Sequence, residues 1–195
     1  SCGLCETRTQ TVFADGVGQI PVMFIGEAPG YTESVQGRPF VGASGKLLDK
    51  WLEHFTLLRR QDVYVTNICK HRPPHNATPK VTECRPYMPY LYEEIQAVQP
   101  RVIVTLGAVA AHMFDRHVKM KEEHGIGRLH RIEGVWEGVW VPLWHPAYAL
   151  RFPNVFEQCV QDVARLHGEV ERLGKEHVAP EYALATEDEV VAYLL

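Results

Sequence analysis

The chain has 195 residues, of which 46% are apolar and 23% charged, and its net charge is −4 with histidine neutral. This length and apolar content are sufficient for one globular domain with its own core. The chain contains no run of about 18 apolar residues and no basic-then-apolar leader, so we expect a soluble, cytoplasmic monomer without a membrane partner. The acidic balance argues mildly against nucleic acid as a partner, but it does not exclude a local basic patch.

Short apolar runs alternate with segments of helical periodicity along the chain. The runs that predict strands are 21–25, 62–66, 101–106 and 139–143. The segments that predict helices are 42–55, 83–98, 107–114 and 156–173, with a proline-rich loop at 71–79. Continuously apolar strands that alternate with helices favour a mainly parallel sheet covered by helices on both faces.

The composition changes near the C-terminus, which divides the chain into two parts. We expect one domain over residues 1–174, and a linker with the start of a following domain over 175–195. Within the second part, 182–186 has the pattern of a strand, and Thr186 is a plausible cap for a helix that starts at 187.

Polar motifs follow the first, second and fourth predicted strands. In parallel sheets the carboxyl ends of the strands border the ligand site, so these motifs should converge on one crevice. Glu27 suits the orientation of a water molecule or the acceptance of a proton, and Asn67 offers a donor and an acceptor to the edge of a pyrimidine. His145 suits hydrogen bonding to a developing oxyanion. A solvated loop acid, a strand cap and a structural histidine are the respective alternatives.

Other residues near the predicted crevice suit nucleic-acid contacts. Phe40 is able to stack on a base, although a phenylalanine alone is more often part of a core. Ser44 and Gly45 lie in a Gly-Ala-Ser-Gly segment that leads into a helix, where backbone N–H groups are able to bind a phosphate. The basic residues that flank the crevice, with solvated surface charges as the alternative interpretation, are Lys70, Arg72 and Arg151.

Five cysteines lie at positions 2, 5, 69, 84 and 159. The odd number, with Cys2 and Cys5 in a Cys-x-x-Cys pair, favours a metal or redox site over a disulfide framework. Cys69 and Cys84 are candidates for the remaining ligands, and the alternative is that both are core residues. His71 is an alternative ligand to Cys69, because residues two apart in an extended segment point the same way. Composition does not separate zinc from iron–sulfur.

Taken together, these motifs resemble family 4 of the uracil-DNA glycosylases. The matching segments, in the order of the family, are Cys2-x-x-Cys5, Gly26-Glu-Ala-Pro-Gly30, Gly37-Arg-Pro-Phe-Val-Gly42, Thr66-Asn67, Arg72-Pro-Pro with Asn76 and Pro79, Cys84-Arg-Pro-Tyr, Leu106-Gly-Ala and His145-Pro-Ala-Tyr148. Each segment is weak evidence alone, but the set covers residues 2 to about 170 and is specific.

The resemblance implies a three-layer α/β/α sandwich with a central four-stranded, mainly parallel sheet. It implies a [4Fe–4S] cluster, uracil-containing DNA as substrate, and hydrolysis of the N-glycosidic bond after base flipping. Glu27 would activate water, Phe40 would stack on the flipped uracil beside Gly26, Asn67 would read its edge, and His145 would stabilise the departing anion. The residues expected to contact DNA are Ser44, Gly45, Lys70, Arg72, Asn76 and Arg151.

Two departures from the family pattern affect these expectations. The family has Lys-Cys-Arg-Pro-Pro where this chain has His71, so the cluster ligands are expected to be Cys2, Cys5, Cys69 and Cys84, with His71 as the alternative to Cys69. A related branch traps uracil-DNA covalently through a loop histidine, but that position holds Asn76 here, which favours turnover over trapping.

Three functions remain in competition at this point. The first is an active uracil-DNA glycosylase. The second is a non-catalytic or covalently trapping module attached to a DNA polymerase, since residues 182–194 resemble the opening of the 3′–5′ exonuclease domain of family A DNA polymerases. The third is a zinc-binding or redox domain without uracil chemistry.

Overall fold

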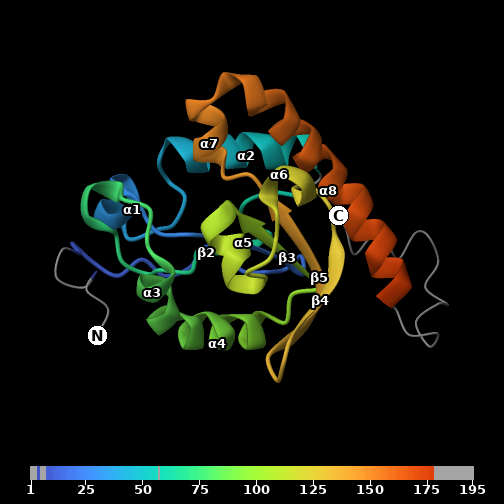
Figure 1. Ribbon diagram of the computed structural model, residues 1–195, viewed down its shortest axis with the longest axis horizontal. Helices are drawn as coiled ribbons and strands as arrows, with labels where there is room; N and C mark the ends of the chain where they lie inside the picture. The colour runs from blue at the N-terminus through green and yellow to red at the C-terminus, as the bar shows by residue number, and fades with distance from the viewer. Residues whose placement is uncertain (1–3, 5–7, 57, 178–195) are drawn as a thin grey trace.

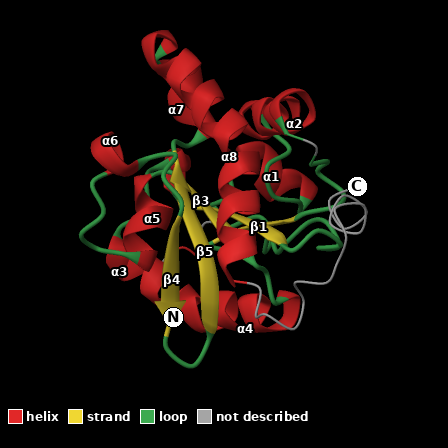
Figure 2. Cartoon of the chain, turned by 90° about the vertical axis from the view of Figure 1, so that its right-hand side faces the viewer, coloured by secondary structure: helices red, strands yellow, loops and turns green. Residues whose placement is uncertain are grey.

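The computed structural model of the protein describes residues 4, 8–56 and 58–177. Its centre is a five-stranded sheet in the order β2-β1-β3-β5-β4. The strands are β1 (Val22–Gly26), β2 (Tyr64–Asn67), β3 (Val102–Leu106), β4 (Arg128–Ile132) and β5 (Trp136–Leu143). All neighbouring pairs are parallel except β4 and β5, which form an antiparallel hairpin at one edge of the sheet (Figure 2).

Helices cover both faces of this sheet (Figure 1). Side chains alternate along β1, so Val22 and Phe24 join one apolar cluster while Met23 and Ile25 join the other. The first cluster lies under α2 (Ala43–Phe55), α7 (Pro146–Arg151) and α8 (Phe156–His177). The second lies under α4 (Met88–Val98) and α5 (Ala108–Phe114). The shorter helices are α1 (Tyr31–Gln36), α3 (Val81–Cys84) and α6 (Met120–Glu123).

The α/β/α class predicted from the sequence is confirmed, and the sheet has one strand more than expected. The additional strand, β4, has the sequence Arg-Leu-His-Arg-Ile and alternates between half-buried and exposed residues at the edge of the sheet. It therefore lacks the continuous apolar run that identified the other strands. The predicted helix at 83–98 is divided into α3, a 3₁₀ turn at Arg85–Tyr87 and α4.

Helix α8 extends through His177, where the described residues end. The division of the chain expected between residues 174 and 175 stays a prediction. The strand and helix predicted at 182–186 and 187–195 lie outside the described residues. No helix in the described ranges is long and apolar enough to cross a bilayer.

The register of the strands brings three loops to one edge of the sheet. Gly26 at the end of β1 pairs with Asn67 at the end of β2, while Leu106 at the end of β3 pairs with Leu143 at the end of β5. Gly107, which follows β3, has φ of +91°, and a Cβ there would lie 3.1 Å from Cβ of His145. A residue without a side chain at this point therefore leaves room for the histidine beyond β5.

Candidate active site

A cavity of about 180 Å³ lies at the carboxyl edge of the sheet. It is smaller than the roughly 300–1,000 Å³ pockets that take drug-sized ligands, so it suits a single small ring. Its lining consists of Glu27, Ala28, Pro29, Gly30, Glu33, Phe40, Ser44, Asn67, Pro73, Asn76, Ala77, His145, Ala147 and Arg151. The structure thus brings together the three strand-end residues and the aromatic residue singled out from the sequence. A wider, more open hollow of about 870 Å³, lined by residues between Asp15 and Gln61, contains none of them.

Asn67 and Phe40 meet over the backbone of Gly26. A Cβ at Gly26 would lie 2.4 Å from Oδ1 of Asn67 and 2.5 Å from Cζ of Phe40, which is closer than real contacts allow. Asn67 is 1% exposed, and its Oδ1 has no hydrogen-bond partner in the described part of the protein. A buried amide oxygen without a donor is costly, so the cavity presents an acceptor that a ligand N–H is able to satisfy.

The hydrogen bonds of His145 determine which ring nitrogen carries the proton. His145 caps α7, and its Nδ1 accepts a hydrogen bond from the backbone N–H of Ala147 at 3.1 Å. Burial lowers the pKa of His145 to about 4, and the positive charge of Arg151 contributes to this lowering. The imidazole is therefore neutral near pH 7, with its proton on Nε2. A neutral donor remains available on the cavity side of the ring.

Glu27 lies on the same wall, immediately after β1. Burial raises the pKa of its carboxyl above the usual value, and the positive charge of Arg151 opposes this shift. A carboxylate with a raised pKa is a stronger base than a solvated one, and it is typical of residues that accept protons in active sites. The charge of Arg151 therefore lowers the pKa of both Glu27 and His145.

A second carboxylate of the lining, which was not predicted from the sequence, holds the loop that carries Phe40. Glu33 accepts hydrogen bonds from the backbone N–H groups of Val41 and Gly42 at 3.0 and 2.7 Å, and from that of Gly30 at 3.1 Å. Glu33 is three residues after Gly30, which is the spacing of a helix capping box, and this spacing is the sequence pattern that could have identified it. Gly42 is the N-cap of α2, so the Glu33 carboxylate lies beside the start of the segment at which a phosphate was expected.

Gly45, one of the predicted DNA contacts, has a packing role in the structure, and its contact with DNA stays a prediction. Gly45 is buried, and a Cβ there would lie 1.8 Å from the carbonyl oxygen of Phe40. The absence of a side chain at Gly45 allows the Phe40 loop to pass over α2, so close packing alone accounts for a glycine at this position. Ser44, by contrast, lines the cavity.

Lys70 lies inside the protein, unlike the exposed Arg151 and Asn76, and its contact with DNA stays a prediction. It is 3% exposed, and its Nζ donates to Glu94 Oε2 at 2.7 Å, to Thr66 Oγ1 at 2.7 Å and to the Asn67 carbonyl at 2.8 Å. Burial lowers its pKa, and the charge of Glu94 opposes the shift. All three donor positions of the ammonium are engaged inside the protein, so Lys70 supports the end of β2.

The remaining predicted DNA contacts lie at the mouth of the cavity. Asn76 and Arg151 are exposed and line it. Arg72 donates from Nε to Oδ1 of Asn76 at 2.7 Å, and its guanidinium lies 5.0 Å from the ring centre of Tyr31. His75 is next to Asn76 in the chain but is not part of the lining.

Cys69 and Cys84 form a separate, fully buried pair with their sulfur atoms 3.6 Å apart. The hydrogen bond from Cys69 lowers the pKa of Cys84. Leu4, which lies between the other two candidate ligands in the sequence, is buried in the same apolar cluster. Cys2 and Cys5 themselves lie outside the described residues. Among the residues that are described, no group of three or more His, Cys, Asp and Glu side chains is arranged to hold a metal ion.

His71 has partners on both ring nitrogens. Arg8 donates to Nε2 at 3.1 Å, Thr11 Oγ1 lies 3.2 Å from the same nitrogen, and the Tyr87 hydroxyl lies 2.7 Å from Nδ1. Because a guanidinium only donates, Nε2 is the acceptor and Nδ1 carries the proton. Both ring nitrogens of His71 are therefore engaged by these neighbouring side chains.

Comparison with known proteins places this geometry in a family. The family described as "Uracil DNA glycosylase superfamily" matches residues 13–164. The chain belongs to this superfamily. It is 39% identical over 128 residues to the type-4 uracil-DNA glycosylase of Saccharolobus solfataricus, covering 66% of this chain and 59% of that protein. It is 38% identical over 172 residues to the type-4 enzyme of Pyrobaculum aerophilum, covering 86% and 87%.

The extent of the match varies among these relatives. The matched segment spans 59%, 48% and 57% of the length of three type-4 relatives, so part of each lies outside the comparison. A DNA polymerase of Bacillus phage SP01 is 26% identical over 131 residues, which cover 67% of this chain and 14% of the polymerase.

The buried network of Lys70 generates a prediction about stability. Lys70→Met should lower the free energy of unfolding by about 3–5 kcal/mol, because it leaves the Glu94 carboxylate buried without its cation. Urea denaturation measures this, with Arg72→Met as a control expected to change stability by about 0.5 kcal/mol or less. The double variant Lys70→Met/Glu94→Leu should recover most of the loss. If Lys70→Met left the stability unchanged but weakened DNA binding, Lys70 would instead be a phosphate contact.

Proposed function

We propose that the protein hydrolyses the N-glycosidic bond of uracil in DNA and leaves an abasic site, as the first step of base excision repair. The observation that carries this proposal is the convergence of Glu27, Phe40, Asn67 and His145 on one small cavity, in a chain that belongs to the uracil-DNA glycosylase superfamily. The names of the type-4 relatives support the reaction and the substrate.

Recognition of the base rests on Asn67 and Phe40. The target nucleotide leaves the stack at a cost of a few kcal/mol, which contacts inside the cavity must offset. The unpartnered Oδ1 of Asn67 accepts the imide N–H of uracil, while the adjacent amide N–H₂ donates to a ring carbonyl. Stacking on the buried Phe40 ring supplies attraction that does not depend on hydrogen bonds.

In the chemical step, Glu27 acts on a water molecule and His145 acts on the leaving uracil. The oxygen of the water forms a bond to C1′ of the deoxyribose, and the electron pair of the C1′–N1 bond leaves with uracil. Glu27 accepts the proton that the water loses, and its negative charge favours the cationic sugar. The neutral His145 donates from Nε2 to O2 of the departing uracil anion.

The surface around the cavity supports DNA binding despite the acidic net charge. Arg151 and Arg72 supply positive charge beside Ser44 and Asn76, which fits contacts to the phosphates on either side of a flipped nucleotide. Asn76, rather than His75, lines the cavity, and this supports turnover over covalent trapping.

We propose that a [4Fe–4S] cluster is held by Cys2, Cys5, Cys69 and Cys84. The fully buried pair of thiols in an apolar cluster fits such a group, because thiolates are soft ligands and burial protects a cluster from water. The engaged nitrogens of His71 support Cys69 as the third ligand. The cluster would cross-link the N-terminal segment to the loop after β2, a structural contribution distinct from hydrolysis.

A finer proposal concerns the context of the domain. The likeness to the phage DNA polymerase, together with the resemblance of residues 182–194 to an exonuclease domain, supports a polymerase covalently continuous with this chain. The mass of the native protein tests this, since a fusion would greatly exceed the 22.2 kDa of the present chain.

The central prediction is that uracil release slows when either the catalytic base Glu27 or the pyrimidine-binding Asn67 is replaced. Glu27→Gln should slow release about 10²–10⁴-fold, because the amide cannot accept the proton. Asn67→Ala should also slow release strongly, since it removes both hydrogen bonds to the ring. The measurement is alkaline cleavage of labelled oligonucleotides that contain one uracil, in single and double strands, with the exposed Glu53→Gln as a control. Absence of product from the wild-type protein on both substrates would overturn the proposal.

The cluster assignment predicts different metal contents for two neighbouring variants. Cys69→Ser should lose iron and acid-labile sulfide, whereas His71→Ala and the control Cys159→Ser should retain both. Elemental analysis and visible absorbance of purified protein make the comparison. Iron loss in His71→Ala but not in Cys69→Ser would exchange their roles, and zinc in place of iron would contradict the cluster.

The charge of Arg151 predicts a change in the pH profile. Activity should fall as the pH drops through the raised pKa of Glu27, because the protonated carboxyl is no longer a base. Arg151→Gln removes the charge that lowers this pKa, so the acidic limb of kcat/KM should move to higher pH. Arg101→Gln, an exposed change at the opposite end of β3, should leave the limb in place. A shift to lower pH in Arg151→Gln would contradict this electrostatic account.

A further inference from the structure

The loop that carries Phe40 has an unusual backbone conformation. Phe40 has φ of +53°, in the left-handed region that bulky residues rarely adopt. Its ring is nevertheless buried in the cavity wall, 5.7 Å from the ring of His145 with an angle of 24° between their planes. Strained residues of this kind persist only where the surrounding structure holds them.

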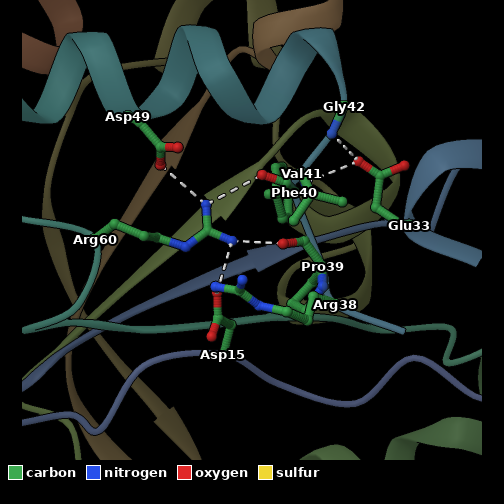
Figure 3. Close-up of polar contacts among 9 residues, drawn as sticks. All are labelled: Asp15, Glu33, Arg38, Pro39, Phe40, Val41, Gly42, Asp49 and Arg60. Atoms are coloured by element: carbon green, nitrogen blue, oxygen red, sulfur yellow. Dashed lines mark hydrogen bonds and ion pairs between the residues drawn. The ribbon is translucent and has the colours of Figure 1, made fainter. Parts of the chain in front are cut away.

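Arg60 holds the carbonyl side of this loop (Figure 3). Its Nη2 donates to the carbonyl oxygen of Pro39 at 2.5 Å, and its Nη1 donates to that of Phe40 at 3.3 Å. The same guanidinium pairs with Asp49 Oδ1 at 3.0 Å and lies 3.5 Å from Oδ2 of Asp15. The two carboxylates come from separate segments and fix the guanidinium in the plane that suits both carbonyls.

Glu33 holds the amide side of the same loop, as described for Val41 and Gly42. Figure 3 shows the two charged side chains on either side of residues 39–42. One cation therefore satisfies two consecutive carbonyls, and one anion satisfies the next two N–H groups. We call Arg60 and Glu33 the charged clamp.

We propose that the charged clamp is a positioning device for base stacking, in which Arg60 keeps Phe40 in its strained conformation with the ring presented to the flipped base. This assignment rests on the proposed excision of uracil. Arg60 does not line the cavity, so it acts through Phe40 and not on the substrate.

The clamp explains why a rigid ring is required. A loop that is free to relax would return Phe40 to negative φ and swing its ring away from Gly26 and Asn67. The base would then lose its stacking surface, and each binding event would require the loop to be ordered again. Arg60 provides this order before the base arrives.

The neighbouring arginine offers a matched control. Arg59 has a side chain that is 63% exposed and pairs with Asp62, whereas the side chain of Arg60 is 16% exposed. Arg59→Met and Arg60→Met thus remove the same group one residue apart. Arg60→Lys keeps the charge and tests folding, but its single ammonium lacks the fork that spans two carbonyls.

The test is a double-variant cycle of Arg60→Met and Phe40→Ala, with kcat/KM for uracil release, the dissociation constant of free uracil and that of DNA with an abasic analogue as readouts. Arg60→Met should lower kcat/KM and weaken free uracil binding on the order of tenfold, as expected for loss of base stacking. Binding of abasic DNA should stay within about twofold, since it needs no stacking on Phe40. In the Phe40→Ala background, Arg60→Met should have little further effect. Arg60→Lys should lie between the wild type and Arg60→Met, and Arg59→Met should match the wild type.

Several results would overturn the proposal. Arg60→Met with wild-type kcat/KM, or with an equal loss in the Phe40→Ala background, would show that Arg60 does not act through Phe40. If Arg60→Met and Arg60→Lys both weakened the binding of abasic DNA to the same extent, Arg60 would have a general structural role and not one in stacking. A wild-type protein that releases no uracil would refute the proposed function itself, which distinguishes that failure from the failure of the clamp alone.

Discussion

The parallel pairing of β1 with β2 is the constraint on which the rest of the site depends. Their register places Gly26 directly beside Asn67, and the missing side chain of Gly26 leaves the space into which the Asn67 amide and the Phe40 ring both project. A shift of this register by one residue would turn Asn67 toward the other face of the sheet. Strand β1 is buried along its whole length and packs into both cores, so packing of the core supports the geometry of the cavity.

The charged groups around the cavity fall into those that form internal hydrogen bonds and those that remain available to a ligand. Glu33 forms internal hydrogen bonds that support the loop before α2, and Lys70 forms internal hydrogen bonds that support the end of β2. In the proposed reaction, Glu27 is the base, with a raised pKa, and the neutral His145 is the hydrogen-bond donor. The charge of Arg151 lowers the pKa of both groups, which supports the proposal that it tunes the site and attracts DNA.

Much of this arrangement was predictable because it follows from strand order and residue type. Glu27, Asn67 and His145 each follow an apolar run, and parallel strands place such positions at a common edge. The edge strand β4 was missed because its exposed residues hide the apolar pattern. The burial of Lys70 and Gly45 was not predictable, because neither a positive charge nor a glycine-rich segment reveals burial. The contacts of Arg60 were also out of reach, since they join segments that are distant in the sequence.

The most direct test of the central claim is a crystal structure of the Glu27→Gln variant bound to duplex DNA with one uracil. The uracil should leave the helix and occupy the cavity, with its face on Phe40 and its edge on the Asn67 amide. A uracil that remains stacked in the duplex, or one held at a site away from Asn67 and His145, would contradict it.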